Sequence, residues 1–207
     1  MTHTLHRKGD KEGLSNDYIV FAISAQTVNA KGSAPKFKEF GDIVLKYNPV
    51  NYGDMKTGNA YNVGVDKVHE SYKDNSIVHA VFTEEDIVAK VLKELREADL
   101  GLSIVLSGIV EHTSECCHKI SIEPHTIEYS LGIHGKTDSL PEDNVVEIST
   151  MCGHGMVSFS LIEHFCEEIE KGRITADEAA RKLAKQCHCG VFNPTRAAEI
   201  LRLMTDM

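Results

Sequence analysis

Three cysteines in the C-terminal third of this 207-residue chain have the residue types and setting of metal ligands. Cys187 and Cys189 frame His188 in a Cys-His-Cys-Gly run, and Cys152 opens a Cys-Gly-His-Gly run earlier in the chain. Thiolates bind soft and borderline metals because deprotonated sulfur is charged and polarisable. The adjoining glycines allow close backbone approach and positive φ. We therefore expect one metal or cluster site that gathers these three thiols.

The spacing leaves the identity of the metal open. Three cysteines are enough for an iron–sulfur cluster with one open iron, and a [4Fe–4S] cluster is the favoured hypothesis. The alternative is zinc, bound by the same thiols and a histidine. Cys117 is the best candidate for a fourth thiolate, and Cys116 is the other choice. The runs match neither a ferredoxin pattern nor a zinc ribbon with two CxxC pairs, so three ordinary buried thiols remain the competing interpretation.

Four further residues near these cysteines could take part in chemistry. His154 and His188 are candidate catalytic residues or ligands, because an imidazole titrates near neutral pH; hydrogen-bonded turn histidines are the alternative. Arg196 and Asn193 are candidate substrate-binding residues, since a guanidinium can hold a carboxylate or phosphate through two hydrogen bonds. Arg196 could equally be a solvated surface charge. Cys166 falls on an apolar helical face, which predicts a core residue.

The elements that must position these residues alternate between apolar strand-like runs and helical patterns. A helix that opens at Thr83 and ends near Gly101 separates two strands, which suggests a βαβ unit with a right-handed crossover. Glycine, proline and asparagine break up residues 26–73, a pattern typical of a binding or lid region or of irregular hairpins. Strands are predicted at residues 17–25, 42–47, 77–82, 102–109, 125–133 and 145–150.

Helical patterns follow the candidate ligands. Thr175 and Glu178 form a capping box, and Asn193 with Pro194 opens the last helix. Cys152 is thereby placed at a strand-to-helix turn, and Cys187 at a helix end with Gly190 in the left-handed cap position. Free amides at a helix start would favour an anionic ligand there. Helices are predicted at residues 114–122 and 156–171, from 175 onward, and from 194 onward.

These elements predict an α/β or α+β fold, with a mixed β-sheet, βαβ units and three C-terminal helices. The length fits a single domain over residues 1–207. Within it, residues 1–75 are expected to be an irregular, turn-rich part, and residues 76–207 an α/β part that carries the cysteine site.

Composition narrows the function classes. The formal net charge of −9 argues against general nucleic-acid binding and against an anionic membrane surface as partner. No apolar run reaches membrane-spanning length, and Met1–Asp10 lacks the apolar core of a secretory signal. We therefore expect a cytoplasmic protein, in which six cysteines would stay reduced rather than form structural disulfides.

The leading hypothesis is a cytoplasmic metalloenzyme with a cysteine-bound iron–sulfur cluster, performing lyase or sulfur-transfer chemistry on a small anionic molecule. A zinc enzyme or zinc-stabilised module that uses the same cysteines is the first alternative. A metal-free enzyme with Cys152 as nucleophile is the second, because a helix start lowers the pKa of a thiol. A non-catalytic interaction protein also remains open.

Overall fold

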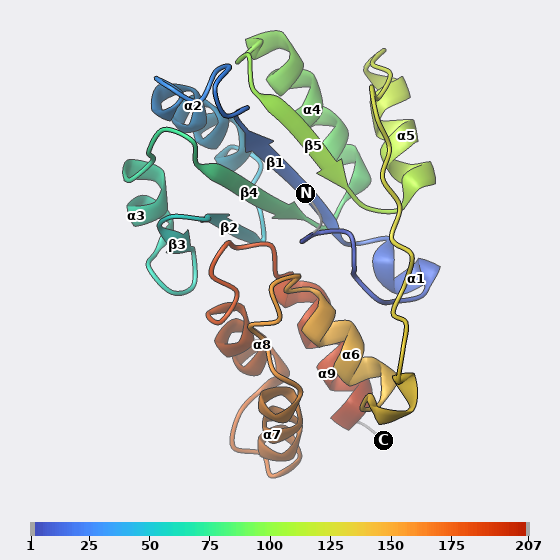
Figure 1. The fold of residues 1–207 in the computed structure, drawn as a ribbon. Helices are drawn as coiled ribbons and strands as arrows, with labels where there is room; N and C mark the ends of the chain where they lie inside the picture. Colours follow the sequence, from blue (N-terminus) through green and yellow to red (C-terminus); the bar gives the residue numbers. More distant parts are fainter. Residues whose placement is uncertain (1–2, 206–207) are drawn as a thin grey trace.

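The computed structural model describes residues 3–205 and contains a five-stranded sheet with helices packed on both of its faces (Figure 1). The mixture of helices and strands confirms the predicted fold class. Every neighbouring pair of strands is antiparallel, where a mixed sheet was expected. The strands, in the spatial order β3-β2-β4-β1-β5, are β1 (Tyr18–Ile23), β2 (Asn51–Asp54), β3 (Gly58–Asn59), β4 (Ile77–Phe82) and β5 (Ser103–Ser107).

The predicted βαβ unit is present in a split form. Helix α4 (Glu85–Ala98) connects β4 to β5, and both strands pair antiparallel with β1. They are therefore parallel to each other, with β1 inserted between them. Helix α2 (Ala34–Leu45) connects β1 to β2 in the same way across β4. Two interleaved units of this kind form the split βαβ arrangement, which explains why a parallel crossover leads to a fully antiparallel sheet.

The helical predictions near the C-terminus are confirmed. Thr175 and Glu178 form a complete capping box, and the Asn193 side chain accepts a hydrogen bond of 3.1 Å from the backbone N–H of Arg196. The remaining helices are α1 (Lys11–Leu14), α3 (Val65–Glu70), α5 (Val110–Lys119), the 3₁₀ turn η1 (Thr137–Ser139), α6 (Asp143–Thr150), α7 (Phe159–Glu170), α8 (Ala176–Ala184) and α9 (Pro194–Thr205).

Two predicted strands are helices instead. Residues 145–150 belong to α6, where Val145, Ile148 and Ser149 are buried at helical spacing. A short apolar run fits both a strand and one buried helical face, so its pattern cannot separate them. Residues 42–47 begin within α2, which also gives structure to the region 26–73 that was expected to be irregular.

The strand predicted at residues 125–133 does not form in the described part of the chain. Its alternating apolar residues are real but exposed: Ile127 is 51%, Tyr129 66% and Leu131 84% exposed. No strand of the sheet pairs with this segment. Alternation makes a strand only where a neighbour supplies backbone partners, and that neighbour is missing here.

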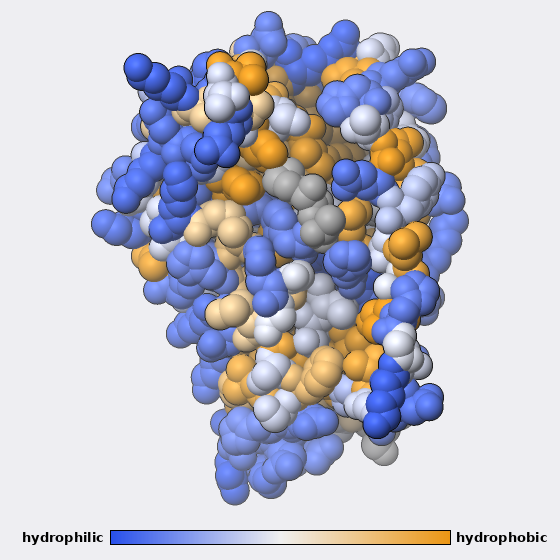
Figure 2. All heavy atoms as spheres, in the orientation of Figure 1, coloured by the Kyte–Doolittle hydropathy of each residue, from blue (hydrophilic) through white to orange (hydrophobic). Residues whose placement is uncertain are grey.

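Strand β1 serves a hydrophobic core on each face of the sheet. Val20 and Ala22 point to the core that contains α2 and α4. Ile19 and Phe21 point to the opposite core, which contains residues of α6 to α9. Figure 1 shows these C-terminal helices as one group below the sheet. In Figure 2, hydrophilic side chains cover most of the rim of the viewed face, as expected from the net charge of −9.

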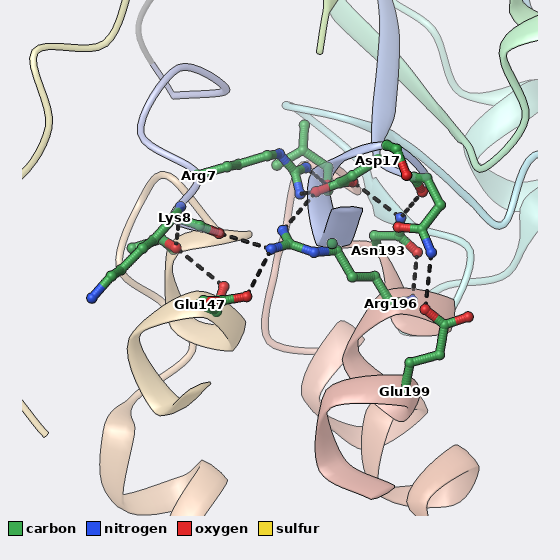
Figure 3. A network of polar contacts seen from close by, with 12 residues as sticks. Arg7, Lys8, Asp17, Glu147, Asn193, Arg196 and Glu199 are labelled. Carbon is green, nitrogen blue, oxygen red and sulfur yellow. Dashed lines mark hydrogen bonds and ion pairs between the residues drawn. The ribbon is translucent and has the colours of Figure 1, made fainter. Parts of the chain in front are cut away.

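A buried ion network fixes the N-terminal arm, residues 3–10, to the body of the protein (Figure 3). Asp17 is fully buried, and its Oδ2 accepts hydrogen bonds from Arg7 Nη1 at 2.8 Å and Arg196 Nη1 at 3.1 Å. Arg7 also donates to the backbone carbonyl of Val191. The single carboxylate of Asp17 therefore links the arm, the approach to β1, and α9.

Further hydrogen bonds extend this network to α6. Arg196 Nη2 donates to Glu147 Oε2 at 3.0 Å and to the Lys8 carbonyl at 2.8 Å. Asn193 Nδ2 donates to Asp17 Oδ1 at 3.0 Å. The guanidinium of Arg196 is thus surrounded by internal acceptors from three parts of the chain (Figure 3).

Removing the buried guanidinium tests how much the fold depends on this network. Arg196→Ala should lower the free energy of unfolding by about 3–5 kcal/mol, because it removes one of the two guanidinium partners of buried Asp17 and the ion-pair partner of Glu147. Urea unfolding followed by circular dichroism measures the change. Arg202→Ala, which breaks the exposed pair with Asp177, is the matched control and should leave the unfolding free energy nearly unchanged. Equal behaviour of the two variants would contradict a structural role for the network.

Candidate metal centre

The structure brings Cys152, Cys187 and Cys189 together beneath the sheet, as their sequence context predicted. Their side chains are buried, with exposed fractions of 2%, 0% and 1%. The sulfurs of Cys187 and Cys189 lie 4.0 Å apart, and the thiols of Cys152 and Cys187 share a hydrogen bond. Their role as ligands stays a prediction.

Cys152 lies in the loop between α6 and α7. The predicted strand before it is α6, so Cys152 follows a helix end and does not sit at a strand-to-helix turn. The loop is tight, because the Cys152 carbonyl accepts a hydrogen bond from the Gly155 N–H at 2.9 Å. Ser149 Oγ closes it by donating to the Val157 carbonyl at 2.7 Å. The amides that reach the Cys152 thiol belong to the loop and not to a helix start: backbone hydrogen bonds from Met156 and His154 lower its pKa, but the hydrogen bond with Cys187 and burial outweigh them.

The loop with Cys187 and Cys189 follows α8 and is held by the β2–β3 hairpin. Gly190 has the predicted left-handed conformation, with φ of 79°. Asn59 Nδ2 donates to the Cys187 carbonyl at 2.6 Å. Gly53 packs so closely that a Cβ on it would lie 2.5 Å from the Cys189 carbonyl oxygen. Only a glycine on β2 lets the sheet approach the cysteine loop at this distance.

Three imidazoles border the thiols. His154 Nδ1 lies 3.6 Å from the Cys189 sulfur. The ring of His3 stacks on His154 with centroids 5.0 Å apart, and His3 Nε2 lies 2.8 Å from His79 Nε2. We call the whole group the Cys₃His₃ cluster; its members are His3, His79, Cys152, His154, Cys187 and Cys189.

His3 and His79 were not among the residues singled out from the sequence. His79 is fully buried in the middle of β4, within the otherwise apolar run Ile-Val-His-Ala-Val-Phe. A polar residue inside such a run is a usable signal, because burying it without partners is costly. His3 lies in the polar arm and carries no comparable signal; it joins the cluster because the arm folds back over the loop of Cys152.

Burial keeps the two histidines in the metal-binding state. Desolvation, aided by the nearby His154, lowers the pKa of His3 to about 4. Desolvation and the neighbouring His3 likewise lower the pKa of His79 well below its usual value. Both imidazoles are therefore neutral at pH 7, and a neutral imidazole does not have to lose a proton before it binds a metal.

The three thiols differ in acidity. The hydrogen bond from Cys187 lowers the pKa of Cys189. For Cys187, the hydrogen bond with Cys152 lowers the pKa, but the bond to Cys189 and burial outweigh it and raise the value to about 12. The hydrogen bond with Cys187, together with burial, raises the pKa of Cys152 strongly. Cys189 is therefore the thiol that loses its proton first.

The structure does not bring Cys117 or His188 into the cluster. Cys117 lies on α5 in the wall of a cavity of about 570 Å³ beside β5, one edge of the sheet. The cluster contacts β4 and β2, toward the other edge. Cys116 is buried, with its thiol directed to the Glu85 carbonyl at 3.6 Å. His188 is exposed between the two loop cysteines.

The candidate substrate-binding residues are also placed elsewhere. Arg196 and Asn193 are 1% and 0% exposed, and their polar groups bind Asp17 and its neighbours in the ion network. Their side chains therefore organise the fold around the arm. Cys166 is partly buried and packs against the core that contains residues of α6 to α9, as predicted from its apolar helical face.

Comparisons with protein-family models, with curated proteins and with solved structures found no match to this chain. Among the described residues, no helix has the length and apolar character needed to cross a membrane. Inference about function therefore depends on the geometry and chemistry of the chain's own residues.

The contact between the arm and the Cys152 loop can be tested at a glycine. A Cβ on Gly153 would lie 1.7 Å from the His3 carbonyl oxygen, so Gly153→Ala must push the arm away from the loop. We expect a loss of roughly 1–3 kcal/mol in unfolding free energy, as for overpacking elsewhere, and faster tryptic cleavage at Arg7. Gly13→Ala in α1 is the control, because its new Cβ would meet its nearest neighbour at 3.2 Å. Unchanged cleavage would show that the arm does not seal this loop.

Proposed function

We propose that this chain is a metalloprotein that binds a zinc-type ion through Cys152, Cys187 and Cys189, with His154 as the fourth ligand. One observation carries the proposal. A tetrahedral ion with metal–sulfur and metal–nitrogen distances of about 2.3 and 2.0 Å separates two sulfurs by about 3.8 Å, and a sulfur from a nitrogen by about 3.5 Å. Two pairs already have separations near these values: 4.0 Å for Cys187 and Cys189, and 3.6 Å for Cys189 and His154. The four candidate ligand atoms do not all lie within 4.8 Å of one another, so the two loops would have to close on the ion.

An iron–sulfur cluster is the second candidate. The presence of three cysteines without a fourth thiol favours it, because a [4Fe–4S] cluster with one open iron needs this number. Each cysteine of such a cluster binds a different corner iron, which sets the sulfurs farther apart than two thiolates on one ion. The short separation of Cys187 and Cys189 therefore supports the single ion.

The metal-free alternative with Cys152 as nucleophile finds less support. A reactive thiol needs a lowered pKa and some access to substrate. Cys152 has a strongly raised pKa, and its side chain is 2% exposed. Metal binding, in contrast, is compatible with buried thiols, because the cation displaces their protons and its charge compensates the buried thiolates.

The proposed ion ties together two loops that the backbone alone leaves separate. Cys152 belongs to the α6–α7 loop, while Cys187 and Cys189 belong to the α8–α9 loop. A bound zinc-type ion supplies a charged centre that holds thiolates in place and can polarise a bound ligand. His154 is exposed, and its Nδ1 lies 3.6 Å from the Cys189 sulfur. Reduced thiols are required throughout, which fits a reducing compartment such as the cytoplasm.

Metal content of the purified protein tests the proposal. We expect at least one equivalent of zinc by elemental analysis, in colourless protein, and we expect Cys187→Ser to lose it. Cys117→Ser and Cys166→Ser should retain the full metal content, because neither thiol belongs to the Cys₃His₃ cluster. Iron with acid-labile sulfide and a brown colour would instead indicate a bound iron–sulfur cofactor. Metal-free protein after anaerobic preparation and reconstitution would contradict both.

A chelator experiment tests whether the ion supports the fold. Removing the metal should lower the Tm and make Cys152, Cys187 and Cys189 reactive toward an alkylating reagent, because the thiolates lose their shared counter-charge. Mass spectrometry after alkylation locates the modified residues. Cys166, which is partly exposed, serves as the internal control and should react to the same extent with and without metal. Equal protection of the three thiols in metal-free protein would contradict the role of the ion.

A further inference from the structure

A second group of ligand atoms adjoins the thiols. His3 Nε2, His79 Nε2 and Cys189 Sγ come from the arm, from β4 and from the α8–α9 loop. We propose that they form a second metal site, with the Cys189 thiolate bridging two ions. The inference rests on the proposed function, because the first ion is the one held by the thiol set.

The geometry of these atoms is close to what an ion needs. The three candidate ligand atoms lie within 4.8 Å of one another. Two imidazole nitrogens on one tetrahedral zinc are separated by about 3.3 Å, given bonds of about 2.0 Å. His3 Nε2 and His79 Nε2 are 2.8 Å apart, so the pair has to open only slightly. His79 is fixed in a central strand, while partly buried His3 lies on the arm and can make this adjustment.

Cys189 is the natural bridge between the two sites. Its sulfur lies between the Cys187 thiol at 4.0 Å and the His154 imidazole at 3.6 Å, and it is also the member of the thiol set grouped with His3 and His79. A thiolate sulfur has lone pairs enough to bind two ions at once.

The two proposed sites differ in their number of protein ligands, and this difference would give them different chemistry. The thiol site has four protein ligands and is closed, as structural zinc sites are. The second site has three protein ligands, which leaves a fourth position for water or for a small polar or anionic molecule, as in catalytic zinc sites. A borderline divalent ion, zinc or cobalt, suits two imidazoles and one thiolate.

Stoichiometry tests the second site directly. Metal-free protein titrated with Co²⁺ under anaerobic conditions should take up two equivalents, counted by native mass spectrometry. His3→Ala should bind one equivalent and keep the thiolate-to-cobalt absorption of the first site. His6→Ala, an exposed histidine on the same arm, is the matched control and should still bind two equivalents. His79→Ala should behave like His3→Ala; His3→Ala, outside the central strand, keeps the test valid where His79→Ala fails to fold.

The outcomes separate this inference from the proposed function. One equivalent in the wild type, with the same uptake by His3→Ala, would overturn the second site and leave the thiol site intact. The histidine pair would then be a hydrogen bond that holds the arm. No cobalt uptake at all, or uptake unaffected by Cys187→Ser, would overturn the proposed function itself.

Discussion

The buried carboxylate of Asp17 is the constraint on which the arrangement of this protein depends. Two guanidinium groups, from Arg7 and Arg196, share one of its oxygens in a region closed to water. A buried charge without its partner costs several kcal/mol, so the arm, the approach to β1 and α9 can take only positions that keep the network complete. The ion network thereby also restricts the positions of the candidate ligands, because the arm carries His3 and α9 begins directly after the loop of Cys189.

Close backbone packing at two glycines fixes the positions of the two cysteine loops. Gly53 lets β2 touch the Cys189 loop, and Gly153 lets the arm touch the Cys152 loop. The centre therefore lies where the sheet, the arm and two interhelical loops meet. Such a junction would suit the proposed metal, since each candidate ligand belongs to its own segment and an ion would supply a contact between the segments. The polar network fixes the arm at one end, and the ligands would fix it at the other.

Local signals predicted the helix caps and three of the strands, and tertiary partners decided the three predicted strands that are not strands in the structure. The capping box at Thr175 and the Asn193 cap depend only on neighbours in sequence, so both could be predicted. The run at residues 145–150 was wrongly predicted as a strand, because a short apolar stretch fits a strand and a buried helical face equally well. The exposed stripe at 125–133 failed as a strand for lack of a neighbour.

The residues of the candidate site also separate into those that local sequence could predict and those that depend on distant partners. The three cysteines could be predicted to meet because they flank helix ends. Cys117 was the best candidate for a fourth thiolate, but α5 packs beside β5, at the opposite edge of the sheet from β2 and β3. Arg196 looked like a ligand-binding residue at a helix start. Its buried partner, Asp17, lies at the other end of the chain, and nothing in the local pattern of either residue indicates the other.

His79 is the residue that argues most directly for chemistry at this centre. A purely structural core would place an aliphatic side chain at this position of β4, against Phe21, and would avoid the desolvation of an imidazole. Beside its contact with His3, the imidazole of His79 forms hydrogen bonds with the backbone of Cys189 and Gly53, and burial keeps both histidines neutral. Local rules of patterning are broken mainly where function requires it. A polar residue in the middle of an apolar strand, beside three thiols, is therefore the residue that the proposed second ion would use and that a purely aliphatic strand could not supply.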